Sequence, residues 1–337
     1  MIRILLAMSV AFVVSAALMP PVIMLSKKLK LRQTILGYVD NHISKNGTPT
    51  MGGVGFLLAL TVVSLVFMKG EHSLMLITLL VTLGYGVIGF LDDFMKVFFK
   101  RNKGLSPWQK IVFQLLMAVV VSFFAYRNIY VGDGVYIPFT FSELKFGIFA
   151  IPFYILIFLA FTNSVNLTDG LDGLAGRVSA TYLTFFALFI GVALYVSGEG
   201  SAYGEEYTNL IIYCAAFVGT LIGFLCFNGF PAKVFMGDTG ALALGGGLAS
   251  LSIVTKMELI APIIGIMYVV TSLSVIMQVA YFKLTKGKRI FLMAPLHHHF
   301  ERKGVHENRI GTVYTSITFV VGLVMLIIMI AVAQNMG

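Results

Sequence analysis

The sequence predicts an all-α integral membrane protein, from its composition, the length of its apolar runs and the placement of its basic residues. Of the 337 residues, 58% are hydrophobic and only 12% are charged, whereas soluble domains are about one quarter charged. Apolar windows of about 20 residues, the length that a helix needs to cross a bilayer, recur along the chain. Because no long polar insertion separates them, we expect residues 1–337 to form a single polytopic membrane domain.

About ten windows qualify as transmembrane helices. They lie near residues 4–25, 52–68, 74–91, 111–126, 147–163, 179–197, 209–227, 239–255, 259–282 and 311–333. The window 259–282 contains Pro262 and Gly265, which predicts a kink or a break in that helix. The connecting segment 127–145 alternates apolar residues around Asp133 and Gly134, which predicts a short hairpin.

Basic residues assign the loops to two sides. Only Arg3 precedes the first window, whereas Lys27, Lys28, Lys30 and Arg32 follow it, which places the N-terminus outside. If the loops 27–50, 92–110, 164–178, 228–238 and 283–310 are cytoplasmic, they contain 19 of the 24 lysines and arginines. An even number of spans then places both termini outside. The net charge of +9 is therefore a topology signal and gives no reason to expect nucleic acid.

The stretch 161–175 is polar within an intensely apolar chain. It contains the carboxylates Asp169 and Asp172 and the amides Asn163 and Asn166. In a helical turn the two aspartates, three residues apart, would share a face and invite a cation. The alternative is a polar connecting loop with an aspartate as helix N-cap, which fits one aspartate better than this density of polar groups.

Two further acidic segments lie on the same predicted face. Asp92 and Asp93 end the third window with Lys96 one turn later, and an interfacial charge cluster with a Lys96–Asp92 pair is the alternative to a site. Asp238 stands between glycines before a small-residue helix, as a magnesium ligand or as an N-cap. Carboxylates that meet from several loops are how a membrane enzyme assembles a metal site for phosphoryl transfer.

Two basic segments share this face. Residues 42–56 form a glycine- and threonine-bearing loop that lacks the spacing of a Walker A motif, although Lys45 and Thr50 suit phosphate or sugar contacts. Residues 289–304 contain His297, His298 and His299. These histidines lack the usual spacing of a zinc site, so we favour binding of phosphate, base or sugar over a solvated turn.

Five stretches carry a resemblance to a known family. They read KNGTPTMGG at 45–53, GFLDDFMK at 89–96, NSVNLTDGLDGLA at 163–175, VFMGDTGALALGG at 234–246 and MAPLHHHFE at 293–301. In this order they resemble the phospho-N-acetylmuramoyl-pentapeptide transferases, a branch of the polyprenyl-phosphate N-acetylhexosamine-1-phosphate transferase superfamily. The first and last stretches point to this branch. One departure is Thr271, which stands where the family typically has a glutamate.

The resemblance implies transfer of phospho-MurNAc-pentapeptide from UDP-MurNAc-pentapeptide to undecaprenyl phosphate, with Mg²⁺, in the bacterial plasma membrane and with the active site facing the cytoplasm. It implies that Asp238 binds the metal and that Asp92 and Asp93 serve the reaction centre. His298, with His297 and His299, would flank the diphosphate and sugar. The remaining implied substrate contacts are Lys45, Thr50, Asn166, Asp169, Gly170, Leu171, Asp172, Asn228, Phe235 and Gln278. Because both substrates would be anionic, we also expect Lys96 and Lys110 to contact them and offset their repulsion.

Other functions stay open at this point. A relative that uses UDP-GlcNAc would share the fold and the metal but differ in its sugar pocket. An ion-coupled transporter would use carboxylates as a relay, but relay carboxylates belong near the bilayer midplane, whereas these gather at one interface. A homodimer is a further hypothesis that the sequence does not test.

Overall fold

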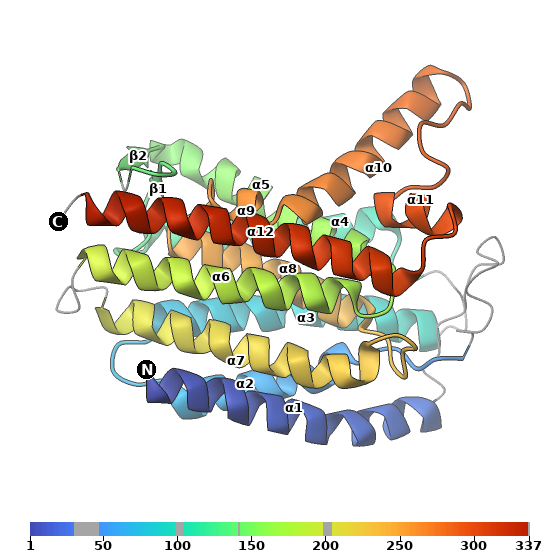
Figure 1. The fold of residues 1–337 in the computed structure, drawn as a ribbon, viewed down its shortest axis with the longest axis horizontal. Coiled ribbons are helices and arrows are strands. Elements are labelled where there is room, and N and C mark those ends of the chain that lie inside the picture. Colours follow the sequence, from blue (N-terminus) through green and yellow to red (C-terminus); the bar gives the residue numbers. More distant parts are fainter. Residues whose placement is uncertain (30–46, 99–103, 141, 198–203, 336–337) are drawn as a thin grey trace.

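The computed structural model describes residues 1–29, 47–98, 104–140, 142–197 and 204–335. Long helices run alternately in opposite directions and pack side by side into one bundle (Figure 1). The prediction of an all-α membrane protein is confirmed. Each of the ten predicted windows is helical, and the helices extend a few residues beyond most of the predicted limits.

The described elements follow the chain in this order: α1 Ile2–Lys28, α2 Gly53–Phe67, α3 Ser73–Phe98, α4 Pro107–Arg127, β1 Gly134–Tyr136, β2 Glu143–Lys145, the 3-10 turn η2 Gly147–Phe149, α5 Ala150–Thr168, α6 Leu174–Ser197, α7 Gly204–Asn228, α8 Gly237–Val254, α9 Ala261–Ile264, α10 Ile266–Leu284, α11 Leu296–Arg302 and α12 Glu307–Gln334.

Among the described residues, eight helices are long and apolar enough to cross a membrane. These are α1, α3, α4, α5 with η2, α6, α7, α10 and α12. Helix α2 has only 15 residues, about 22 Å at 1.5 Å per residue, which is less than the hydrocarbon core of a bilayer. Helix α8, with 18 residues, is the other predicted span that falls outside this group.

Helix α8 is the centre of the bundle. Every residue from Thr239 to Val254 is buried, and the helix packs mainly against α3 and α5. Its sequence is rich in glycine and alanine, which lets neighbouring backbones approach closely in the way that small residues allow in membrane helices. A helix that is enclosed on all sides holds its first turn in a fixed place, and that turn carries Asp238.

The predicted break in the window 259–282 is present. The short helix α9 stops at Ile264, Gly265 separates it from α10, and Pro262 stands in the first turn of α9. After the break, α10 leaves the bundle and projects from it, while α11 returns toward the other helices (Figure 1). The break therefore carries the segment after α10 away from the bundle before α11 brings the histidines back.

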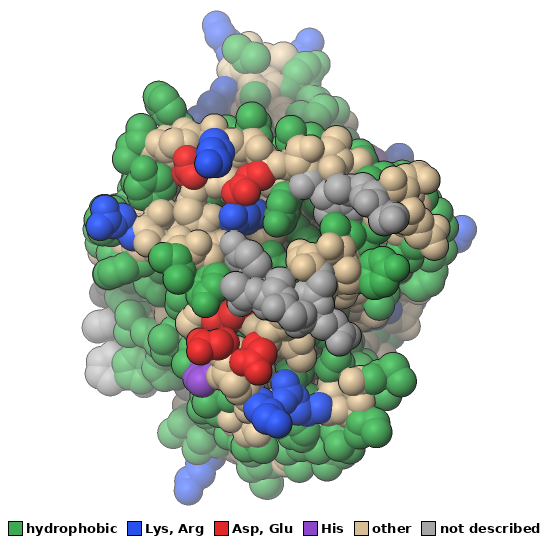
Figure 2. Space-filling view, turned by 90° about the vertical axis from the view of Figure 1, so that its left-hand side faces the viewer, with side chains coloured by type: hydrophobic (Ala, Val, Ile, Leu, Met, Phe, Trp, Pro, Cys, Tyr) green, Lys and Arg blue, Asp and Glu red, His purple; other side chains and the backbone are tan. Residues whose placement is uncertain are grey.

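The two ends of the bundle differ in charge. Helix α1 starts and α12 finishes at one end, and the acidic segments lie at the other (Figure 1). The first end also carries the β-hairpin, and Figure 2 shows acidic and basic side chains next to one another on it. Arg3, Lys69, Arg127, Lys145 and Lys256 belong to element ends that meet there. This sorting agrees with the division of loops that the basic residues predict.

The predicted hairpin is present, and its turn follows Tyr136. Strands β1 and β2 pair antiparallel with Gly134 opposite Lys145, so Gly134 begins a strand and the turn spans the residues after Tyr136. Asp133 accepts a hydrogen bond from the Gly147 amide at 3.0 Å and so joins the hairpin to the start of η2.

Candidate active site

Three carboxylates meet at the end of the bundle opposite the hairpin. Asp92 and Asp93 lie near the end of α3, and Asp238 is the second residue of α8. One oxygen from each lies within 4.8 Å of the other two, and we call these three residues the acidic cluster. Asp92 and Asp93 are each only 3% exposed. Three buried like charges repel one another unless cations stand beside them.

Two glycines bring the acidic cluster together. A Cβ at Gly89, one turn before Asp93, would lie 2.1 Å from the Asp238 carbonyl oxygen, so the α3 backbone reaches α8 only without a side chain. Gly237 has a φ of +75°, and a Cβ there would lie 2.6 Å from Asp93 Oδ2 and 2.9 Å from Thr50 Oγ1. Position 237 therefore requires a residue that adopts a positive φ and has no Cβ, and only glycine meets both requirements.

Asp93 supplies the N-terminal cap of α8 from another helix. Its Oδ2 accepts hydrogen bonds from the Thr239 amide at 2.9 Å and the Thr239 hydroxyl at 2.8 Å, and its Oδ1 accepts from the Asp238 amide at 3.2 Å. The first N–H groups of a helix have no partner within it and favour a negative charge. Asp93 is therefore held rigidly. Asp238 itself makes no cap bond, so its interpretation as an N-cap is wrong.

The partners of the Asp238 carboxylate are long side chains, whereas those of Asp93 include backbone amides. Lys96 Nζ lies 2.5 Å from Asp238 Oδ2, and Lys110 Nζ lies 3.0 Å from Asp238 Oδ1. The Asn166 side-chain amide donates to Asp238 Oδ1 at 2.6 Å, and Lys110 donates to Asn166 Oδ1 at 3.3 Å. Helices α3, α4 and α5 thus each contribute one group to this carboxylate of α8.

The acidic cluster fits a hard divalent cation. The Lys96 ammonium contacts Asp92 Oδ2 at 2.6 Å, Asp93 Oδ1 at 3.6 Å and Asp238 at 2.5 Å, so one positive group already stands among all three carboxylates. The donors that converge there are oxygens only, which is the ligand type that Mg²⁺ prefers. The Lys96 side chain is 38% exposed and carries its ammonium on a long unbranched stem, so this ammonium can move aside for an entering ion.

The turn between α5 and α6 carries the next layer of polar groups. Asp169 follows α5 directly, and burial raises the pKa of its carboxyl well above the usual value, with the Asp238 and Asp93 carboxylates raising it further. A Cβ at Gly170 would lie 2.4 Å from His297 Nε2 and 2.9 Å from His298 Nε2. The histidine segment therefore closes over this turn.

The histidines of α11 differ in their surroundings. His298 Nδ1 pairs with Glu301 Oε2 at 2.8 Å, one turn later on the helix. His297 is fully buried, its ring nitrogens have no hydrogen-bond partner among the described residues, and burial lowers its pKa well below the usual value. His297 is thus a neutral packing group, whereas Glu301 orients the His298 ring beside Gly170.

Comparison with known families reports two matches. The model described as "Glycosyl transferase family 4" matches residues 75–256, which is more than half of the chain and includes the acidic cluster. A signature described as "Phospho-N-acetylmuramoyl-pentapeptide-transferase signature 1" matches residues 45–57, which include Lys45 and Thr50.

Curated relatives agree along nearly the whole chain. A phospho-N-acetylmuramoyl-pentapeptide-transferase of Clostridium perfringens (strain 13 / Type A) is 44% identical over 319 residues, covering 94% of this chain and 96% of the relative. Those of Thermoanaerobacter sp. (strain X514) and Clostridium kluyveri (strain NBRC 12016) are 45% and 41% identical, covering 94% and 96% of this chain and 96% and 98% of the relatives. The chain belongs to the phospho-N-acetylmuramoyl-pentapeptide-transferase family.

Several predicted substrate contacts lie at the acidic cluster. Lys96, Lys110 and Asn166 contact Asp238 directly, and Thr50 stands beside Gly237. The backbone of Phe235 pairs with the segment that carries Thr50, through hydrogen bonds to Pro49 and Gly52 of 2.8 Å and 2.9 Å. Lys45 lies outside the described residues.

Other implied contacts serve the local fold in the structure. Gln278 accepts from the amides of Ile290 and Phe291 and donates to the Phe291 carbonyl, so it holds the segment after α10. Asn228 donates to the Val234 carbonyl at 2.9 Å and closes the loop before α8. Leu171 is 5% exposed. His299 Nδ1 accepts from the Leu292 amide at 3.1 Å.

The paired roles of Asp169 and Asp172 need correction. Residues 169–173 form a turn and not a helix, so the helical spacing that would place both carboxylates on one face does not apply. Asp172 Oδ2 accepts from the Ala232 amide at 2.9 Å, and the Asp172 amide donates to Glu307 at 3.2 Å. Asp172 therefore joins the α5–α6 turn to the loop before α8 and to α12.

Three groups of this site were missed in the sequence. These are Thr239, which binds Asp93, the Leu105 amide, which donates to Asp92 Oδ1 at 2.7 Å, and Glu301, which binds His298. The spacing of His298 and Glu301, three residues apart in a polar helix, is a signal for that pair. A backbone amide in a loop leaves no signal in the sequence.

Proposed function

We propose that this protein transfers phospho-MurNAc-pentapeptide from UDP-MurNAc-pentapeptide to undecaprenyl phosphate. The products are UMP and lipid I, the first lipid-linked precursor of peptidoglycan. Relatives that are 41–45% identical bear the name of this transferase. The observation that carries the proposal is the acidic cluster with Lys96 and Lys110 at one end of a membrane bundle, which suits phosphoryl transfer between two anions.

The lysines address the main obstacle of this reaction. Both substrates are anionic, so their approach to three carboxylates is unfavourable unless cations offset the repulsion. Lys96 and Lys110 already contact Asp238, and each can turn its ammonium toward a phosphate oxygen without leaving the site. The buried setting strengthens such contacts relative to water.

We propose Mg²⁺ as the cofactor. When bound, the ion would polarise the diphosphate and neutralise the charge that develops on it. Asp238 is the carboxylate best placed to hold it, because its partners are the side chains of Lys96, Lys110 and Asn166 rather than the backbone. Those side chains can exchange places with an ion and its phosphate ligands.

The two aspartates of α3 have different parts in the proposed reaction. An oxygen of the lipid phosphate attacks the phosphorus that bears the sugar, and the bond from that phosphorus to the UMP oxygen breaks. Asp92 takes the acceptor's remaining proton, although a phosphate monoester has a second pKa of about 6 and needs little help. Asp93 orients the start of α8, because both of its oxygens accept hydrogen bonds there.

A covalent route would use an aspartate as the nucleophile. Asp93 is poorly suited to attack because α8 occupies its oxygens, and Asp92 would have to leave both Lys96 and the Leu105 amide. We therefore favour direct attack by the lipid phosphate. Rapid quenching of a single turnover would reveal a phosphorylated aspartate if this preference were mistaken.

The polar layer beyond the acidic cluster would receive the rest of the donor. Asn166, Asp169 and Gly170 would contact the nucleotide, with the Phe235 ring stacked on the uracil as aromatic rings stack on bases. His298, held by Glu301, would face the diphosphate and the sugar.

The cytoplasm supplies soluble nucleotide-sugars, so we place this end of the bundle at the cytoplasmic face of the bacterial plasma membrane. Self-association into a homodimer remains a hypothesis.

The decisive experiment measures UMP release by the purified full-length protein. We expect release from UDP-MurNAc-pentapeptide only when both undecaprenyl phosphate and Mg²⁺ are present, together with a lipid-linked product. UDP-GlcNAc in place of the donor should give no product. Turnover with UDP-GlcNAc alone would assign the chain a different sugar, and proton-coupled flux into liposomes without UMP would point to a transporter.

A further inference from the structure

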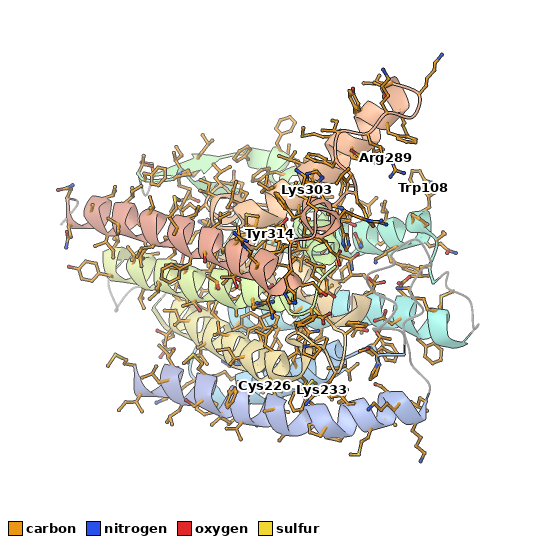
Figure 3. The ribbon with its side chains drawn as sticks, turned by 45° about the vertical axis from the view of Figure 1, so that its right-hand side comes forward. Trp108, Cys226, Lys233, Arg289, Lys303 and Tyr314 are labelled. Atoms are coloured by element: carbon orange, nitrogen blue, oxygen red, sulfur yellow. The ribbon has the colours of Figure 1, made fainter. Side chains whose placement is uncertain are left out.

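A cleft with two arginines lies beside α11, outside the acidic cluster. It has a volume of about 510 Å³ and is lined by Arg289, Leu292, Met293 and Arg302. Arg289 belongs to the segment that follows the projecting helix α10, and Arg302 is the last residue of α11. Figure 3 shows Arg289 and Lys303 at the end of the molecule from which α10 projects. A volume of this size suits a short peptide or a compact organic ligand.

The wall of this cleft is fixed by hydrogen bonds from the body of the protein. Gln278 Oε1 accepts from the amides of Ile290 at 3.1 Å and Phe291 at 2.9 Å. His299 Nδ1 accepts from the Leu292 amide at 3.1 Å, and the Leu296 amide donates to Ser274 Oγ at 3.0 Å. Helices α10 and α11 thus both hold the segment that carries Arg289, so its position is set before a ligand arrives.

The cleft is connected to the reaction centre through α11. Arg302 follows His298 by four residues, which places the two on one face of the helix about 6 Å apart. His298 in turn lies beside Gly170, and the side-chain amide of Asn166, four residues before Gly170 in the chain, contacts Asp238. A ligand with its diphosphate at the acidic cluster that extends past Gly170 and His298 therefore arrives at the arginines.

The chemistry of the cleft indicates carboxylates. Guanidinium groups bind carboxylates through paired hydrogen bonds, and Leu292 and Met293 provide apolar contact for the carbon skeleton between them. The donor of the proposed function carries a pentapeptide joined to muramic acid through its amino end, so the peptide bears at least one free carboxylate. We infer that this cleft binds the carboxylates of the donor's peptide stem, an inference that depends on the proposed function.

The acceptor lipid fits the cleft less well. A polyprenyl chain needs a long apolar track, and only two of the described residues that line this cleft are apolar. An adjoining groove of about 330 Å³ runs along α10, and five of its eight described lining residues are apolar, among them Val275, Val279 and Phe282. Although the groove shares Arg289 with the cleft, Arg302 belongs to the cleft alone among the described lining residues. Arg302 therefore distinguishes the two.

The test compares two donors on the full-length protein. One is UDP-MurNAc-pentapeptide, and the other is the same molecule with every peptide carboxylate converted to an amide. For the native donor, we expect Arg289→Gln and Arg302→Gln each to raise KM about tenfold with kcat nearly unchanged, as for a lost hydrogen bond between charged groups. For the wild type, amidation should raise KM by a similar factor, and the amidated donor should be insensitive to both substitutions.

Neighbouring cations provide matched controls. Lys288→Gln and Lys303→Gln each remove one positive charge beside an arginine, and both should leave the donor KM within about twofold, since neither lysine is among the described residues that line the cleft. If amidation leaves the wild-type KM unchanged, the inference is wrong, whether or not the arginine variants fold. If the arginine substitutions raise the KM of the amidated donor as much as that of the native donor, the arginines would be assigned to the diphosphate instead.

Two further outcomes separate this inference from its alternatives. A raised KM for undecaprenyl phosphate, with the donor KM unchanged in Arg302→Gln, would overturn it in favour of the acceptor lipid. If the wild type releases no UMP from either donor, the proposed function itself fails. If the wild type and every variant turn over both donors, and KM differs neither between donors nor between proteins, the proposed function stays intact and only the peptide-binding role is removed.

Discussion

Asp238 and Glu206 are both acidic residues in the first turn of a helix, yet their partners differ. Glu206 begins α7 at the hairpin end, is fully buried, and accepts hydrogen bonds from the Ser73 and Leu74 amides at 2.9 Å each and from the Ser73 hydroxyl. It caps α3 from outside. The Asp238 carboxylate instead contacts side chains, among them those of Lys96, Lys110 and Asn166. Backbone partners indicate a structural carboxylate, whereas exchangeable side-chain partners indicate one that can bind a ligand.

Asp93 lies between these extremes and shows why burial alone does not identify a functional acid. It caps α8 in the way that Glu206 caps α3, but it also stands 3.6 Å from the Lys96 ammonium inside the acidic cluster. Its fixed position keeps the first turn of α8, and therefore Asp238, in register with Asp92. One carboxylate thus maintains the frame on which its neighbour acts.

The largest expected effect comes from Asp238→Asn. We expect UMP release to fall about 1,000-fold or more, because the change keeps the size of the side chain but removes the charge that would hold the proposed cation. The melting temperature should stay close to that of the wild type, because no backbone group depends on this carboxylate. Wild-type turnover by this variant at limiting Mg²⁺ would refute the assignment of Asp238.

The next effect is smaller and concerns the histidine segment. His298→Ala removes the ring that Glu301 orients beside Gly170, and we expect turnover to fall about 100-fold, in the range typical of a positioned acid–base or phosphate-binding group. Cys214→Ala, within the buried body of α7, should change turnover by less than about twofold. Equal losses in the two variants would count against a substrate role for the segment.

Glu206→Gln should show the opposite pattern from Asp238→Asn. The amide group would place a donor against the amides of Ser73 or Leu74, so the free energy of unfolding should fall by about 2 kcal/mol. Turnover per folded molecule should remain near the wild-type value, because the substitution lies at the end of the bundle away from the acidic cluster. A loss of turnover without a lower melting temperature would break the distinction drawn between the two carboxylates.

The smallest expected effect is a pH dependence of stability from His297. The pKa of this buried ring is well below its usual value in the folded protein, so the unfolded chain binds a proton near pH 6.5 that the folded chain does not. Stability is therefore lost as the pH falls through that value, by about 1.4 kcal/mol between pH 7.5 and 5.5. His297→Gln should lose less melting temperature over this range than the wild type, and equal losses would assign the effect to other groups.

The sequence predicts the frame of this molecule better than its contacts. Apolar windows give the helices and Gly265 gives the break, because both follow from local chemistry. Family motifs bring Asp92, Asp93 and Asp238 to one site. The sequence does not reveal that Asp172 binds a loop amide or that Gln278 braces the segment before α11, because those partners depend on how distant backbones approach. The tight contact at Gly89 sets that approach for α3 and α8.

The Lys96 ammonium among three carboxylates means that the acidic cluster carries its own counter-ion. Many metal proteins unfold on chelation because only the ion offsets the repulsion between its ligands. Here the tethered Lys96 ammonium offsets that repulsion without any bound ion. Chelation should consequently silence the protein while leaving it folded, and restoring the ion should return activity without any refolding step.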